Sequence, residues 1–196
     1  TDAVRILSNV INEYKNKSKS INFSEILNFE TPLLNNPHGG KLIQQFSKMN
    51  RSDTKHMFNI KVDKNTISDI IQICEGTYSP VNSFMCLDEI KSVLKNNSLR
   101  NGYSWTLPII FQIKEDCKNI PLNENILIKN EKNDDIAILK IEKIEKLDQL
   151  NQFFIDWFGT EDINHPGIAN ILSKGNIIIS GKPFLLNDYK NYQNST

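Results

Sequence analysis

The sequence predicts an α+β fold, in which a small mixed or antiparallel β-barrel carries flanking helices and follows a helical arm. Residues 67–74 and 88–96 carry apolar side chains at helical spacing, which predicts two amphipathic helices. Three later runs, 107–114, 125–129 and 135–142, are rich in β-branched residues and are separated by turn-forming Pro, Asn and Asp. Because consecutive short strands usually pair with each other, these runs predict an antiparallel meander or small barrel.

Residues 1–35 predict a helical arm or an inter-domain linker. Apolar residues recur there on one face of a helix: Val4, Ile6, Leu7, Val10, Ile11 and Tyr14. A polar linker over 15–20 and a short helix opened by Ser24 follow. A helix of about four turns is marginal alone in water, so its apolar face must be covered. Packing against the domain and pairing between chains in a homo-oligomer both satisfy this requirement.

A glycine-rich turn follows Pro37 and is the first candidate ligand site: His38, Gly39, Gly40 and Lys41. Paired glycines allow positive φ angles or a close approach to another surface. With a histidine and a lysine they suit an anion site, but a lone histidine beside a glycine turn is commonly structural. Residues 41–49 then show a short helical pattern, and 57–62 alternate as a strand.

A conformational break separates the two central helices. Thr66 is expected to cap the first helix, and Gly76 to end it. Pro80 forbids a helix through the next residues. The apolar residues of the break are too many for a solvated loop and are expected in the core: Tyr78, Val81, Phe84 and Met85. After the second helix, Asn101-Gly102 is a strong turn dipeptide.

The C-terminal third predicts two helices and the last strand. Residues 147–158 carry aromatic side chains at a spacing typical of a core, and a glycine stops that helix. Pro166 suits the first turn of a helix that runs to Lys174, and 177–180 with 184–186 closes the sheet. His165 is the second candidate ligand residue, although it also reads as a turn or capping residue before that helix.

Composition and charge limit the chemistry. Lys plus Arg and Asp plus Glu both number 23, so no overall field attracts nucleic acid or an anionic membrane. Cys74, Cys86 and Cys117 share no metal-ligand spacing and read as buried thiols in a reducing compartment, so a cytoplasmic protein is expected. No metal, no cofactor and no catalytic residue is predicted, because no Ser-His-Asp or Cys-His arrangement is recognisable.

Three motifs in a fixed order resemble one known family. The first is the turn over 37–42, and the second joins the break over 76–85 to Trp105-x-x-Pro108-Ile109. The third runs from Phe158 to Ile168. Together they resemble the opening domain of ATP sulfurylase (sulfate adenylyltransferase), a PUA-like module. The residues that carry its structural motifs are Gly76, Tyr78, Ser79, Pro80, Phe84, Met85, Pro166 and Gly167. The chain departs from the family at Tyr78, where Phe is favoured, and at Asn82-Ser83, where a small residue and Gly are favoured.

The resemblance implies a division into an arm (1–35), the PUA-like domain (36–187) and a polar tail (188–196). ATP sulfurylases join sulfate to AMP and release pyrophosphate, a nucleotidyltransferase reaction of sulfate assimilation, and the family's catalytic residues lie in a later domain. The isolated chain is therefore expected to be inactive. Its expected role is that of a structural and docking module for a catalytic domain of the same or a partner polypeptide. The alternative is a stand-alone PUA-like domain that binds RNA or a nucleotide, which the neutral charge disfavours.

Overall fold

The computed structural model describes residues 36–49, 51–114 and 119–186, which belong to the second of the two units into which the chain divides. The predicted arm over 1–35 and the polar tail over 188–196 lie outside the described residues, as does Cys117. The covering of the arm, by the domain or by a second chain, therefore stays a prediction.

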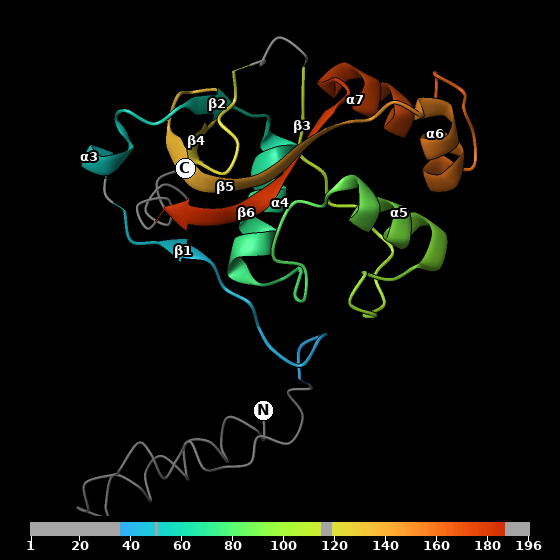
Figure 1. Ribbon diagram of the computed structural model, residues 1–196, viewed down its shortest axis with the longest axis horizontal. Coiled ribbons are helices and arrows are strands. Elements are labelled where there is room, and N and C mark those ends of the chain that lie inside the picture. The colour runs from blue at the N-terminus through green and yellow to red at the C-terminus, as the bar shows by residue number, and fades with distance from the viewer. Residues whose placement is uncertain (1–35, 50, 115–118, 187–196) are drawn as a thin grey trace, which may run out of the picture. The chain divides into compact units, whose positions relative to one another are not determined.

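A mixed sheet forms the centre and helices flank it, which confirms the predicted α+β class (Figure 1). The strands are β1 (Phe46–Ser47), β2 (Asn59–Lys61), β3 (Gln112–Ile113), β4 (Asn125–Lys129), β5 (Asp135–Lys146) and β6 (Ile177–Leu186). The helices are α3 (Arg51–Thr54), α4 (Lys64–Glu75), α5 (Leu87–Asn96), α6 (Leu150–Phe158) and α7 (Pro166–Lys174). The two central helices and the aromatic helix thus form where their apolar spacing predicts them.

The strands are ordered β1-β6-β5-β4-β2, and β3 also pairs with β6. The last three strands, β4, β5 and β6, form an antiparallel meander. The meander predicted from 107–114, 125–129 and 135–142 is correct only for its last two runs, because β3 pairs with β6 and not with β4. The short early strands add the parallel pairs, β1 beside β6 and β2 beside β4. The mixed character therefore arises because segments from the first third of the chain join both ends of a C-terminal meander.

The edge of β6 that faces away from β5 is covered in turn by three distant segments. β3 pairs with Ile177 and Ile178, and β1 pairs with Leu185 and Leu186. Between them Phe84, from the break, bridges Gly181, with its N–H donating to the Gly181 carbonyl over 2.9 Å. A β-carbon on Gly181 would lie 2.2 Å from the Lys140 carbonyl oxygen, so only glycine fits there. The break is thereby fixed beside the central strand pair.

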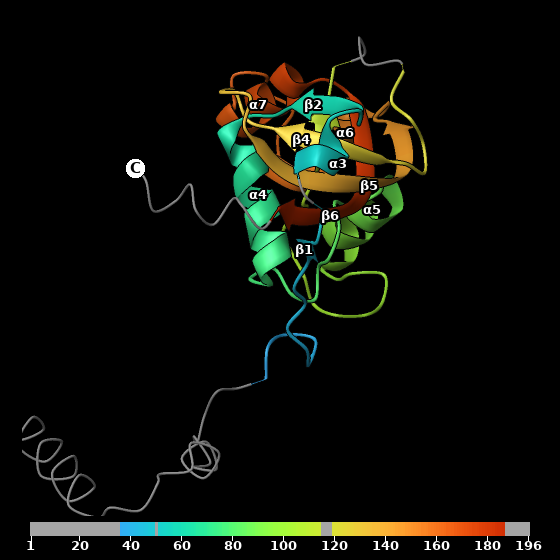
Figure 2. The same ribbon diagram turned by 90° about the vertical axis from the view of Figure 1, so that its left-hand side faces the viewer.

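The core lies between the sheet and the helices, and it contains most of the apolar residues predicted to be buried. In Figures 1 and 2, α4 lies along β6. Its fully buried face carries Ile70, Ile73 and Cys74, and the Cys74 thiol donates to the Pro183 carbonyl over 3.4 Å. In the described part of the chain, no helix is long and apolar enough to cross a bilayer.

Two local predictions are wrong. The helix predicted over 41–49 is an extended segment that contains β1, because tertiary hydrogen bonds hold it: Gln45 N–H donates to Cys74 O over 2.9 Å, and Leu185 N–H donates to Gln45 O over 3.1 Å. The predicted cap, Thr66, lies inside α4. Asp63 caps the helix instead, since its carboxylate accepts the Thr66 N–H over 2.8 Å.

Candidate functional site

The first predicted site, His38 to Lys41, is a turn that docks on the break. Gly39 and Gly40 have φ angles of 82° and 78°, as the paired glycines predict, and the Gly40 N–H donates to Pro37 O over 2.7 Å. A β-carbon on Gly39 would lie 2.7 Å from the Pro80 β-carbon. Gly39 therefore needs to be glycine for two reasons, its positive φ and the close approach of Pro80. The turn thus contacts the second motif directly.

His38 is held by the loop after α5. Its Nε2 lies 2.7 Å from the Ser104 carbonyl oxygen, and its ring meets Tyr103 edge to face at 5.9 Å between centroids. Lys41 is exposed. Because one ring nitrogen of His38 is bonded to a main-chain carbonyl, this contact supports a structural role in which His38 holds the turn against the loop after α5. The use of His38, Gly39, Gly40 and Lys41 as a ligand site remains a prediction.

The break itself is tightly bonded. Gly76 ends α4 with a φ of 90°, and a β-carbon there would lie 2.6 Å from Ile43 O. The Ser79 hydroxyl donates to Gly76 O over 2.6 Å and accepts the Ile43 N–H over 2.9 Å. The peptide bond between Ser79 and Pro80 is cis. Ser79 therefore joins the end of α4 to the extended segment before β1.

The apolar residues of the break lie in the core, as predicted. Phe84 is 1% exposed and its ring centroid lies 5.3 Å from that of Phe111. Met85 is also buried, and its N–H donates to Ile109 O over 2.9 Å. Tyr78 is half-buried, and its hydroxyl donates to Asp69 over 3.3 Å. Burial raises the pKa of Asp69, although that hydrogen bond acts in the opposite direction.

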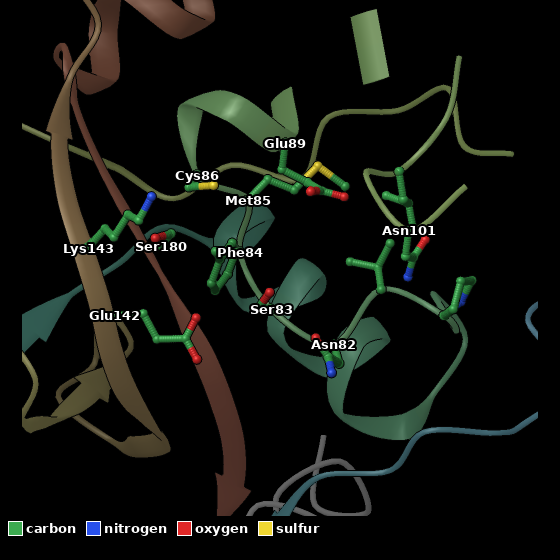
Figure 3. A pocket seen from close by; sticks show the side chains of 13 residues that line it. Asn82, Ser83, Phe84, Met85, Cys86, Glu89, Asn101, Glu142, Lys143 and Ser180 are labelled. Atoms are coloured by element: carbon green, nitrogen blue, oxygen red, sulfur yellow. The ribbon is translucent and has the colours of Figure 1, made fainter. Parts of the chain in front are cut away.

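Ser83 has no positive φ, so its place in a motif that favours glycine strains nothing. Instead, the segment 82–86 forms one wall of a cavity of about 330 Å³ (Figure 3). The other walls come from α5, the turn at Asn101, β5 and β6. Its lining includes the polar or ionisable residues Asn82, Ser83, Cys86, Glu89, Asn101, Glu142, Lys143 and Ser180.

The sequence analysis missed the strand residues of this cavity. A β-bulge in β5 shifts the register between Ile141 and Lys143, so Glu142 and Lys143 both line the cavity instead of alternating between two faces. The one available signal is in the sequence 141–144, where two charged residues interrupt the apolar alternation. Cys86, predicted to be a buried thiol, is only partly buried and lines the same cavity.

The second predicted site residue, His165, belongs to the packing of α6 on α7. It precedes Pro166 as the N-cap of α7, and its ring lies 4.9 Å from Phe158 between centroids. Phe158 in turn stacks on Trp157, and a β-carbon on Gly167 would lie 2.6 Å from the Phe158 ring. The buried Nδ1 of His165 has no hydrogen-bond partner among the described residues. Pro166 and Gly167 thus lie where α6 packs on α7, and their part in the third motif remains a prediction.

The two predicted sites are not brought together. The α6–α7 pair lies at one end of the domain in Figures 1 and 2, and the segment that contains the glycine turn lies at the other. Over the described ranges, no group of three or more His, Cys, Asp or Glu side chains is placed to hold a metal ion. The cavity lined by the break, α5, β5 and β6 is one of several concave features in the described part of the domain.

Comparison with known proteins places this domain in a family. The sequence pattern of the PUA-like domain family matches residues 35–188. The sulfate adenylyltransferase of Persephonella marina is 34% identical over 153 residues, which cover 75% of this chain and 39% of that protein. The enzyme of Ignicoccus hospitalis is 31% identical over 161 residues, which cover 80% of this chain and 42% of that protein. The chain thus spans about two fifths of the length of these relatives.

A solved structure shares the fold. A hexameric APS kinase from Thiobacillus denitrificans superposes with a TM-score of 0.55 and 18% sequence identity, over 76% of this chain and 26% of that chain. At that identity the likeness concerns the fold alone. The sequence match, the three motifs and their contacts agree, and the chain belongs to the PUA-like domain family and is related through this domain to the sulfate adenylyltransferases.

Proposed function

We propose that this chain is the non-catalytic PUA-like domain of a sulfate-adenylyltransferase-type protein and acts as a structural and docking module. The observation that carries the proposal is the mismatch of lengths. About four fifths of this chain matches, but it accounts for only about two fifths of each relative. The parent reaction, in which ATP and sulfate give adenylyl sulfate and pyrophosphate, is then performed by the part that the match does not cover.

The chemistry supports this division. Displacement at a phosphoryl group requires cationic side chains or helix N-termini aimed at the charge that develops. In the motif segments of this chain, the contacts are structural instead: Gly39 packs on Pro80, Ser79 bonds Gly76, and Gly167 packs on Phe158. The three motifs by which the chain resembles the family therefore support a folding and docking role.

The exposed apolar residues of the α6–α7 pair support a docking surface there. Three large apolar side chains are exposed there: Ile155 (46%), Ile163 (67%) and Leu172 (43%). Apolar side chains at such exposure suit a protein interface, and the unmatched part of a relative offers a partner within the same polypeptide. We place the contact with the catalytic domain on this pair.

A domain exchange tests the proposal. The matching domain of the Persephonella marina enzyme is either deleted or replaced by residues 36–186, and sulfate-dependent pyrophosphate release is measured with the melting temperature. The exchange is expected to retain activity and the deletion to lose it. The isolated chain should release no pyrophosphate from ATP and sulfate.

The interface has its own variant pair. Ile163→Asp should lower the melting temperature of the exchanged protein, whereas Leu122→Asp, at a comparably exposed apolar residue (52%), should not. Sulfate-dependent turnover by the pure chain would contradict the non-catalytic assignment. Equal behaviour of the deletion and the exchange would contradict the docking role.

A further inference from the structure

We propose that the cavity beside the β5 bulge binds a small organic monoanion, whose carboxylate is held by Lys143 and Ser180. The proposal does not depend on the role of the domain in a larger protein. It starts from two hydrogen-bond donors that the fold places together in a cavity and that make no hydrogen bond or ion pair with the described residues.

The strand register places these donors side by side. Lys143 and Ser180 are directly paired residues of the antiparallel strands β5 and β6. Side chains of such a pair share one face of the sheet, with β-carbons about 5 Å apart. Both line the cavity, and in Figure 3 the Lys143 side chain extends toward Ser180 and Cys86. The bulge after Ile141 creates this arrangement, because it turns Lys143 to the cavity side.

Neither donor is bonded to another part of the described domain, and Lys143 is exposed. Ser180 is 4% exposed, yet its hydroxyl makes no hydrogen bond within the described ranges. Lys143 makes no ion pair with any described residue. The Ser180 hydroxyl is therefore free to bond a group that enters the cavity, and an ammonium group beside it attracts an acceptor with negative charge. A carboxylate oxygen meets both requirements at once.

The acidic residues of the cavity restrict the charge of the ligand. Glu89 accepts the Arg100 N–H over 3.0 Å, and Glu142 lies 3.9 Å from the Lys182 ammonium. Both acids have partners, so they leave the Lys143 end available. Their charges nevertheless repel a second or third negative charge in the same cavity. A nucleoside triphosphate is therefore disfavoured, and a monocarboxylate is favoured.

The rest of the cavity suits an apolar body. Val81, Phe84, Met85 and Leu99 contribute to its walls, and because each is 5% exposed or less, the apolar surface that they offer is small. Its volume of about 330 Å³ lies at the lower end of the range of ligand sites. The ligand class is thus a small carboxylate with an aromatic or aliphatic group, which packs on these side chains.

Cys86 offers a direct reporter, because it lines the cavity while Cys74 is fully buried. The rate of iodoacetamide labelling of Cys86 is followed by peptide mass spectrometry with benzoate or phenylacetate, and with benzamide or phenylacetamide as neutral counterparts. Ligands of about ten non-hydrogen atoms commonly bind with a Kd of about 1 mM. At about 10 mM, a carboxylate should then slow labelling by about tenfold, and the amides should not.

Variants separate the cavity from general charge effects. Ser180→Ala and Lys143→Met should each remove most of the protection. Lys140→Met changes the same charge on the same strand, at an exposed residue outside the cavity, and should retain it. Backbone amide shifts of Met85 and Ser180 on addition of benzoate or phenylacetate provide a second readout in the unmodified chain. The proposal is overturned if neither carboxylate protects Cys86 nor shifts the backbone amide signals of Met85 and Ser180. It is also overturned if benzamide and phenylacetamide protect Cys86 as well as the carboxylates do.

Discussion

Phe84 is the side chain by which the break between α4 and α5 is anchored in the core, and its removal should be severe. The residue is 1% exposed, so Phe84→Ala removes nearly a whole ring from the interior. About 150 Å² of lost apolar burial, at about 25 cal/mol per Å², corresponds to about 4 kcal/mol. This agrees with the range of about 3–5 kcal/mol typical of such substitutions. Alanine keeps the main-chain N–H that donates to Gly181 O, so the loss of stability should come from the missing packing of the ring.

Urea unfolding followed by tryptophan fluorescence measures this loss. Phe58→Ala is the matched control, because Phe58 is 38% exposed and its removal should cost about 2 kcal/mol or less. A double-mutant cycle with Phe111→Ala should give a coupling of about 0.5–1.5 kcal/mol, since the two rings lie 5.3 Å apart. Equal urea midpoints for the Phe84 and Phe58 variants would refute the assignment of the break to the core.

Three further predictions concern single groups. Gly39→Ala should destabilise the domain by at least about 1 kcal/mol more than Gly40→Ala. Both glycines have positive φ, but only at Gly39 would the new β-carbon meet Pro80, at 2.7 Å. Equal melting temperatures of the two variants would contradict the docked turn. Asp63→Ala should cost about 1 kcal/mol in urea unfolding, since it removes the cap of α4, and an unchanged midpoint would argue against that cap. Burial raises the pKa of Cys74 from 9.0 to about 12, so its contribution to stability is complete below pH 9 and is lost as the pH rises toward 12, by about 1.4 kcal/mol per pH unit. Cys74→Ala should abolish that part of the slope, and parallel pH curves for the two proteins would show that the thiol ionises equally in both states.

The helices were predictable because their signals are local. Apolar spacing, the glycines at 76 and 159 and Pro166 all act within one or two turns, and α4, α5, α6 and α7 form at those residues. The pairing of β4 with β5 was predictable for a similar reason, since a short turn joins the two strands. The extended segment that contains β1 was not, because its hydrogen bonds come from α4 and β6, far away in the chain.

The class of the fold, the burial of the break and the membership in a family all follow from the sequence alone. These properties depend on side-chain type and on short-range spacing, and both can be read from the amino-acid sequence. Only the tertiary structure decided which polar groups meet. It separated His165 from the glycine turn, and through one bulge in β5 it placed Lys143 beside Ser180 in a cavity. The physical reason is that register between distant strands is set by the packing of the whole core, and a shift of one residue changes the face on which a side chain lies.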